Sequence, residues 1–155
     1  MTTTNPLLDF SCLPRFYAIR PEHVTPAINE LLTDNRSLLA RLETAPATWD
    51  DFAAPFFDGS ERLSRAWGIV GHLHSAMDVP EWREAYNAHL PEVTRFFAEL
   101  GQNQHLFAQF KALKTGPDYE KLTAAQVRNV EHEIRGFRLS GAEPPDAVKP
   151  RFQAI

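Results

Sequence analysis

The pair His132 and Glu133 is the first place in the sequence where metal chemistry could arise, because HExxH motifs begin with these two residue types. Such a motif places two imidazoles at i and i+4 on one helical face, where both ligate zinc and the glutamate lies beside the bound water. The position that would hold the second histidine is Gly136. The helical pattern also places His132 with Arg128 and Arg135 on a polar face. We therefore expect His132 to be a solvated surface residue, not a metal ligand.

The histidines of the second and third predicted helices are the next candidates. His72 and His74 are two positions apart, about 200° around a helix, so they cannot chelate one metal together. His74 and His89 fall on the apolar stripes of two helices that we expect to be antiparallel neighbours, so they can meet in the core. No Asp, Glu or Cys on the same stripes completes a zinc site. A shared hydrogen-bond network or simple burial is favoured, with a two-histidine metal site as the alternative.

Other catalytic signatures are missing from the sequence. It contains no glycine-rich phosphate loop, no GxSxG and no nucleophile placed with a convergent His and Asp. The lone Cys12 has no disulfide partner and no CxxC neighbour, which favours a reducing compartment. We predict no catalytic, cofactor-binding or metal-ligating residue in this chain.

The composition is that of an ordinary globular domain. Hydrophobic residues make up 43% of the 155 positions, and 16 Lys and Arg stand against 20 Asp and Glu, for a net charge of −4. This acidic excess lacks the clustered positive charge typical of nucleic-acid binding. No apolar run approaches the roughly 18 residues of a membrane helix, and residues 1–6 do not form a secretory signal. The prediction is a soluble cytoplasmic protein with neither nucleic acid nor membrane as a partner.

Apolar residues recur at spacings of three and four, which predicts an all-α fold, a helical bundle of five or six amphipathic helices. Residues 1–19 are the exception, because Pro6 and Pro14 interrupt helical periodicity. We expect them to form an extended arm, and residues 20–155 to hold the helices of a single domain. The arm would be pinned to the surface by four apolar side chains, Leu7, Leu8, Phe10 and Phe16.

Capping residues predict where the helices begin. Thr25 before Pro26 predicts the start of the first helix, and Thr48 that of a second helical region, which Pro55 and Gly59 should kink or split. The stripe of this second region contains Leu63, Trp67, Val70, His74 and Met77.

The later helices have equally local signals. A third helix should run from Pro80 to Gly101, with a bend at Pro91, and a fourth should follow Asn103. A capping box formed by Thr123 and Gln126 opens a fifth helix, which Gly141 closes. The residues expected in the core are Leu31, Leu39, Trp67, Val70, Tyr86, Val93, Phe96, Val130, Ile134 and Phe137.

The last residues begin one more apolar stripe. Val148, Phe152 and Ile155 follow the helical spacing, but no C-terminal cap comes after them. Either the chain is a fragment of a longer protein, or it has a natural C-terminus that frays.

A series of short stretches, in order along nearly the whole chain, resembles the N-terminal segment of bacterial members of the thimet oligopeptidase family of zinc metallopeptidases. The stretches are NPLL at 5–8, LPRF at 13–16, IRPEHV at 19–24, PAI at 26–28, RAWG at 65–68, REAYN at 83–87, LP at 90–91, GQN at 101–103 and FRL at 137–139 with Gly141. Departures cluster at 74–82, where the family pattern has Asn near His74, Asn-Thr near Asp78 and Val79, and Leu at Trp82.

The resemblance implies a non-catalytic domain of a peptidase. In this family, the zinc site of HExxH plus a downstream Glu belongs to the C-terminal half, and the N-terminal helices form one wall of a channel that admits short peptides. The expected partners are therefore the missing C-terminal catalytic half and, for the parent protein, zinc and short peptide substrates. Because the last apolar stripe ends without a cap, the isolated fragment is also expected to expose apolar surface, and therefore to associate with itself or to bind a hydrophobic dye. The alternative is a freestanding helical protein-interaction module, which the gene sequence beyond Ile155 would distinguish.

Overall fold

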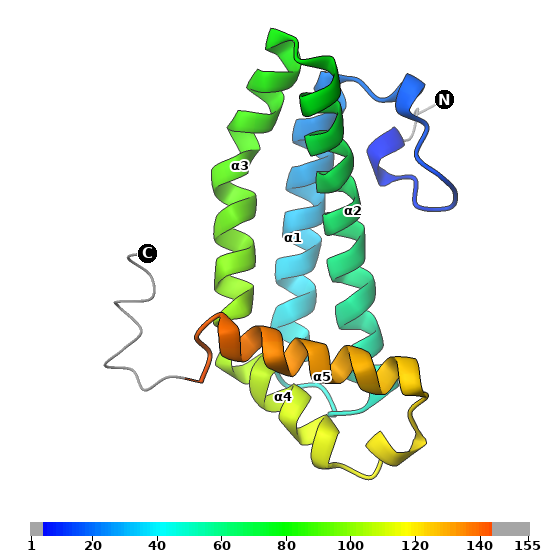
Figure 1. The fold of residues 1–155 in the computed structure, drawn as a ribbon, viewed down its shortest axis with the longest axis vertical. Coiled ribbons are helices and arrows are strands. Elements are labelled where there is room, and N and C mark those ends of the chain that lie inside the picture. Colours follow the sequence, from blue (N-terminus) through cyan, green and yellow to red (C-terminus); the bar gives the residue numbers. More distant parts are fainter. Residues whose placement is uncertain (1–4, 144–155) are drawn as a thin grey trace. The chain divides into compact units, whose positions relative to one another are not determined.

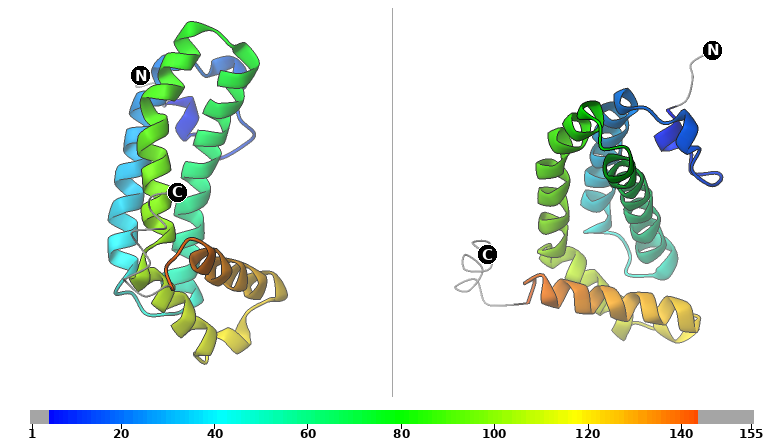
Figure 2. Two further views of the ribbon diagram at one scale, coloured as in Figure 1. Left: turned by 60° about the vertical axis from the view of Figure 1, so that its left-hand side comes forward. Right: turned by 45° about the horizontal axis from the view of Figure 1, so that its top comes forward.

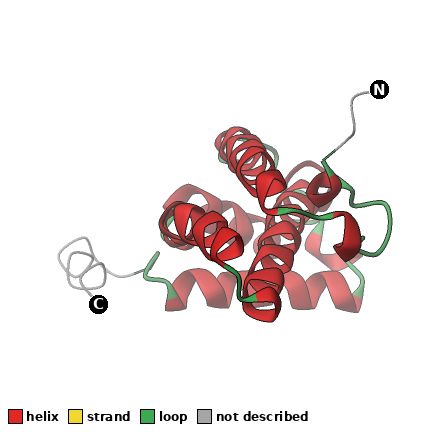
Figure 3. Cartoon of the chain, turned by 90° about the horizontal axis from the view of Figure 1, so that it is seen from above, coloured by secondary structure: helices red, strands yellow, loops and turns green. Residues whose placement is uncertain are grey.

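The computed structural model describes residues 5–143, which form five α-helices joined by short turns (Figures 1 and 3). No strand occurs among these residues. The predicted all-α fold is thus confirmed, whereas the stripe that contains Val148, Phe152 and Ile155 lies outside the described residues. The helices are α1 (Val24–Leu42), α2 (Ala54–Met77), α3 (Pro80–Gly101), α4 (Gln104–Thr115) and α5 (Ala124–Leu139).

The described residues divide into two compact units. Unit 1 takes in residues 5–37 and 57–94, and unit 2 takes in residues 38–56 and 95–143. Within unit 1, the portions of α1, α2 and α3 lie side by side (Figure 2). Within unit 2, α4 and α5 pack against each other (Figure 1).

The structure extends the N-terminal arm to residue 23: residues 5–23 contain no α-helix but three single turns of 3₁₀-helix, Pro6–Leu8, Phe16–Ala18 and Pro21–His23. Asn5 ties its start to the rest of unit 1: the side-chain oxygen accepts from the amide of Leu7 at 3.0 Å, and the side-chain amide donates to the carbonyl of His23 at 2.9 Å. Leu7 is fully buried, as an anchor should be. Phe16, in contrast, remains 43% exposed, with its ring edge against His72.

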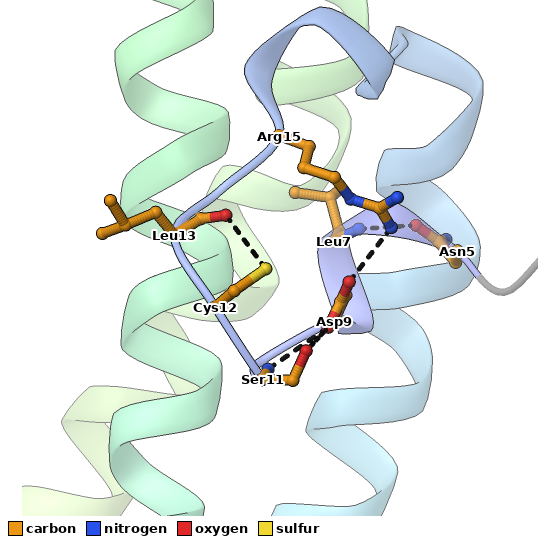
Figure 4. A network of polar contacts seen from close by, with 7 residues as sticks. All are labelled: Asn5, Leu7, Asp9, Ser11, Cys12, Leu13 and Arg15. Carbon is orange, nitrogen blue, oxygen red and sulfur yellow. Dashed lines mark hydrogen bonds and ion pairs between the residues drawn. The ribbon is translucent and has the colours of Figure 1, made fainter.

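The loop of the arm is held by Asp9 (Figure 4). Its carboxylate accepts from the amide and the hydroxyl of Ser11 and pairs with Arg15 at 3.0 Å. These bonds from Ser11, followed by the charge of Arg15, lower the pKa of Asp9. The arm is therefore positioned by polar contacts as well as by Leu7, the one buried side chain of the four predicted anchors.

The prediction that Thr25 caps the first helix is wrong. A 3₁₀ turn leads directly into α1, which begins at Val24, so Thr25 lies inside the first helical turn. Its hydroxyl makes a tertiary contact instead, 2.9 Å from Nε2 of His89 on α3. A threonine at a helix start can serve either purpose, and neighbouring residues alone do not decide between them.

Further contacts join the helices of unit 1. Arg36 of α1 pairs with Glu92 of α3 at 3.1 Å. Trp67 and Tyr86 stack with ring centroids 4.8 Å apart, joining α2 to α3. Both rings are only half-buried, so their assignment to the core is corrected, because each covers the other at the surface. The other predicted core residues are buried.

The second helical region begins at Thr48, as predicted, with the hydroxyl accepting from the amide of Asp51 at 3.1 Å. A π-helical turn, Trp49–Ala53, precedes α2. The predicted split at Pro55 and Gly59 is wrong, since α2 is one continuous helix from Ala54 to Met77, whereas the alternative of a kink stays a prediction. Pro55 falls in the first turn of α2, where a missing N–H costs little.

Unit 2 is built around packed aromatic rings. Phe110 lies 4.7 Å from Phe52, 5.0 Å from Phe56 and 5.8 Å from Phe137, measured between ring centroids. Two of these pairs are edge-on and the third is tilted, which are arrangements that aromatic rings favour. All four residues are buried.

The caps of unit 2 match the sequence expectations. Asn103 accepts from the amide of Leu106 to begin α4, and Thr123 and Gln126 form the predicted capping box of α5. Gly141 has φ of 90°, and the amide of Ala142 returns to the carbonyl of Phe137 at 2.9 Å. This closing pattern needs a left-handed residue, which explains the glycine.

Candidate functional site

The histidines that sequence analysis considered do not converge. His132 is exposed, with Nδ1 4.0 Å from Oε1 of Glu133 on the same helix. His74 stacks on the ring of Tyr86 at 4.4 Å, whereas His89 is buried against Thr25, so the two have different partners. Within residues 5–143, no three His, Cys, Asp or Glu side chains come close enough to hold a metal. The predicted absence of metal ligands in the whole chain remains a prediction.

The candidate site is an apolar recess of about 520 Å³ in unit 1, between the arm and the end of the α2–α3 hairpin. We call it the arm recess. Its apolar lining comes from residues 16–21 on one side and 73–82 on the other. The main apolar side chains are Phe16, Tyr17, Leu73, Met77, Val79 and Trp82.

The hairpin side of the arm recess is shaped by a tight connection. Asp78 has φ of 43°, in the left-handed region that a non-glycine residue seldom adopts. Arg83 holds this turn, because its guanidinium donates to the Asp78 carbonyl at 3.1 Å and to its carboxylate at 2.6 Å. The turn brings Val79 and Trp82 to the recess beside the last turn of α2.

The arm side is shaped by two 3₁₀ turns. The amide of Ile19 donates to the carbonyl of Phe16, and the amide of Arg20 donates to Nδ1 of His23 at 2.9 Å. Ile19 is buried and anchors this stretch. Tyr17, two residues before it, is 79% exposed. A buried anchor beside exposed aromatic groups gives a fixed backbone that presents apolar surface to solvent.

Two opposite charges also line the arm recess, Arg20 from the arm and Glu81 from α3. Both residues are exposed. Among the described residues, neither side chain has an ion-pair partner. The recess therefore combines an apolar lining with one available guanidinium and one available carboxylate, a combination typical of ligand sites.

A smaller cavity of about 140 Å³ lies in unit 2, beside Glu133. Burial raises the pKa of Glu133, and the charge of His132 opposes this only in part. The remaining lining is mostly apolar or glycine, including Phe97, Leu100 and Gly136. A single carboxyl group in a space this small offers no constellation for catalysis.

Sequence analysis did not foresee the arm recess. Met77 falls on the predicted stripe of its helix, but it is 55% exposed, so its assignment to that stripe is corrected. The one signal in the sequence is the density of apolar residues in the arm, which by itself predicts only anchoring. The stretch 74–82, where the sequence departs from the family pattern, forms much of the hairpin side of the recess.

No helix in residues 5–143 is both long and apolar enough to cross a membrane.

Comparison with known proteins places this helical chain in a family. Residues 28–147 match the family model of the neurolysin/thimet oligopeptidase N-terminal domain. The chain belongs to this family, which confirms the resemblance seen in its sequence.

The similar full-length proteins are oligopeptidases. Oligopeptidase A of Haemophilus influenzae is 35% identical over 156 residues, which cover 100% of this chain and 23% of that protein. Oligopeptidase A of Escherichia coli is 36% identical over 154 residues, which cover 98% of this chain and 23% of that protein. The probable cytosolic oligopeptidase A of Arabidopsis thaliana is 34% identical over 154 residues, which cover 99% of this chain and 22% of that protein. The chain thus spans less than a quarter of the length of these relatives.

Proposed function

We propose that this chain is the non-catalytic N-terminal domain of a zinc-dependent oligopeptidase that hydrolyses short peptides. The observation that carries the proposal is the similarity to oligopeptidase A along the entire chain, combined with coverage of only 23% of that protein. A chain that is similar to oligopeptidase A over its whole length, and that matches the N-terminal domain model of this family, is expected to serve the same kind of enzyme.

The zinc ion belongs to the rest of the protein in this proposal. The described residues do not fit a zinc site, since they hold no group of three ligand side chains. The closest sequence, His132-Glu133, has an exposed histidine and Gly136 where the second ligand would be. The catalytic half that follows would supply the ligands, and the domain described here would form part of the wall of the substrate channel.

The cytoplasm is the proposed compartment. The exposed Cys12 thiol fits a reducing environment, and one relative carries the word cytosolic in its name. The absence of a membrane-spanning helix among the described residues is compatible with this location.

The test compares the full-length gene product with the 155-residue chain. The full-length protein should cleave a quenched fluorescent peptide of about ten residues, and a zinc chelator should abolish the activity, because zinc polarises the scissile carbonyl and activates water. The 155-residue chain should neither cleave the peptide nor retain stoichiometric zinc after purification without a tag. Chelator-sensitive cleavage by the chain itself, or a gene that ends at Ile155, would contradict the proposal; the second result would favour a freestanding interaction module.

A further inference from the structure

We propose that the arm recess of unit 1 binds a short apolar peptide with free ends, whose carboxylate pairs with Arg20 and whose ammonium group pairs with Glu81. The proposal rests on the geometry and charges of unit 1. It concerns binding only, so its failure would leave the proposed peptidase role of the full-length protein intact.

The apolar side chains of the arm recess are unusually exposed. Four side chains that line the arm recess keep large fractions of their surface in water: Tyr17 79%, Met77 55%, Phe16 43% and Val79 37%. A cluster of exposed apolar groups on a folded domain commonly marks a binding surface. Leu73 and Trp82 are buried and give the recess a firm inner wall. An apolar side chain placed here would remove these groups from water.

The arm recess also carries two charged side chains of opposite sign. Arg20 and Glu81 line the same recess, yet no ion pair joins them to each other or to another described residue. The neighbouring Arg83 is already engaged by Asp78 at 2.6 Å, so it does not neutralise Glu81. A guanidinium is well suited to bind a carboxylate through two parallel hydrogen bonds. A carboxylate accepts equally well from an ammonium group.

These charges select among ligand classes. An anionic apolar molecule would pair with Arg20 but face repulsion from Glu81, and a cationic one would meet the reverse situation. A neutral apolar molecule would partly desolvate both charges without pairing either. A ligand with both charges and an apolar side chain would pair with Arg20 and with Glu81 and would also cover the apolar lining. Short peptides with free ends have this composition.

The volume agrees with a ligand of this kind. About 520 Å³ lies within the roughly 300–1,000 Å³ range of small-ligand sites. An extended peptide of two to four residues spans about 7–14 Å. The length that binds best would report the spacing between the two charged groups.

The tryptophans provide a direct measurement. Trp82 lines the recess, whereas Trp67 stacks on Tyr86 and Trp49 belongs to unit 2. In ¹H–¹⁵N spectra of the 155-residue chain, titration with the dipeptide Phe-Leu should shift the Trp82 indole signal in a saturable way, with the other two indole signals as internal references. The affinity should be in the millimolar range, since the ligand is small and the site is open. Gly-Gly, which has both charges and no apolar side chain, should bind much more weakly.

Matched variants and blocked peptides separate the two charges. Arg20→Gln should weaken binding of Phe-Leu by about tenfold, the size of one lost charge-assisted contact, and leave binding of its C-terminal amide unchanged. Glu81→Gln should weaken binding of Phe-Leu similarly and leave binding of the N-acetylated peptide unchanged. Both residues are exposed, so the variants should fold. Glu84→Gln, an exposed carboxylate of α3 outside the recess lining, and Leu13→Ala, an exposed apolar residue of the arm outside it, are controls that should bind like the parent.

Each result bears on the proposal. Saturable shifts of Trp82 that follow the matched pattern of variants and blocked peptides would establish the site. The absence of a saturable shift, or equal binding of free and doubly blocked peptide, would overturn it. Equal loss of binding in the control variants would also overturn it, because the effect would then not depend on Arg20 or Glu81.

Discussion

Nε2 of His89 lies 2.9 Å from the hydroxyl oxygen of Thr25, and this bond joins α3 to α1 inside unit 1. His89 is only 6% exposed, and its other ring nitrogen, Nδ1, has no hydrogen-bond partner among the described residues. The ring therefore depends on Thr25 for its one protein hydrogen bond. The sequence predicts either a hydrogen-bond network shared with His74 or simple burial for His89, and the structure shows the burial; the predicted helix cap at Thr25 is replaced by this contact.

Removal of this hydroxyl should destabilise the domain. Thr25→Val keeps the shape of the side chain but leaves both ring nitrogens of a buried histidine without a partner, which should cost about 1–3 kcal/mol in the free energy of unfolding. Urea denaturation measures the effect. Thr33→Val is the matched control on the same helix, since the Thr33 hydroxyl is exposed and bonds only to the carbonyl of Asn29. Equal stability of the two variants would show that the contact with His89 contributes nothing.

The neighbouring residues Phe96 and Phe97 should differ in their contributions to stability. Phe96 is 3% exposed and Phe97 is 36% exposed. Phe96→Ala should cost about 3–5 kcal/mol, because it opens a cavity where packing relaxes poorly. Phe97→Ala should cost about 1 kcal/mol, in line with its smaller burial. A loss below 1 kcal/mol for Phe96→Ala would place this side chain outside the core.

Two glycines of unit 2 should respond oppositely to alanine. A Cβ at Gly101 would lie 2.8 Å from both Cβ and Oγ of Ser140, whereas a Cβ at Gly136 would meet nothing within 4 Å. Gly101→Ala should therefore destabilise by about 1–3 kcal/mol through overpacking. Gly136→Ala, inside α5, should stabilise by about 0.4–1 kcal/mol because it restricts the unfolded chain. Thermal melts of the two variants test both signs, and a stabilising Gly101→Ala would contradict the close approach to Ser140.

The pH dependence of stability should show the environment of Glu133. Burial raises the pKa of this carboxyl in the folded state, so the folded protein holds the proton more tightly than the unfolded chain does. Ionised Glu133 thus lowers stability, and this loss develops as pH rises from the ordinary glutamate pKa through the raised one. Glu133→Gln should raise the Tm at about pH 7 and have little effect at about pH 3.

Glu131 is the control of opposite sign on the same helix. Its hydrogen bond and charge interaction with Lys114, at 3.0 Å, lower the pKa of this carboxyl, so its stabilising contribution is present above the ordinary pKa and is lost as pH falls through the lowered one. Glu131→Gln should lower the Tm slightly at about pH 7. If both variants shifted the Tm in the same direction, the two pKa directions could not both hold.

The sequence alone determined the helical class and most helix ends of this protein. Caps such as Asn103 and the pair Thr123 and Gln126 act on amides within three residues, and the glycine at 141 closes α5 through bonds within five residues. The apolar spacing that places Val93 and Phe96 in the core is equally local. Interactions over so few residues can be deduced from residue order.

Tertiary structure decided which side chains of α2 are covered by neighbouring elements, and how the arm and the α2–α3 hairpin form the arm recess. Trp67 and Met77 share the stripe of buried Val70. Trp67 nevertheless stacks on Tyr86 at the surface, and Met77 lines the arm recess. Helical spacing gives the direction of a side chain around its own axis, but not how far the neighbouring helix extends to cover it. The arm recess requires residues 16–21 to meet 73–82, which are more than 50 positions away in the sequence. Only the folded chain brings Arg20 and Glu81 to the same surface, because their placement depends on packing across that separation.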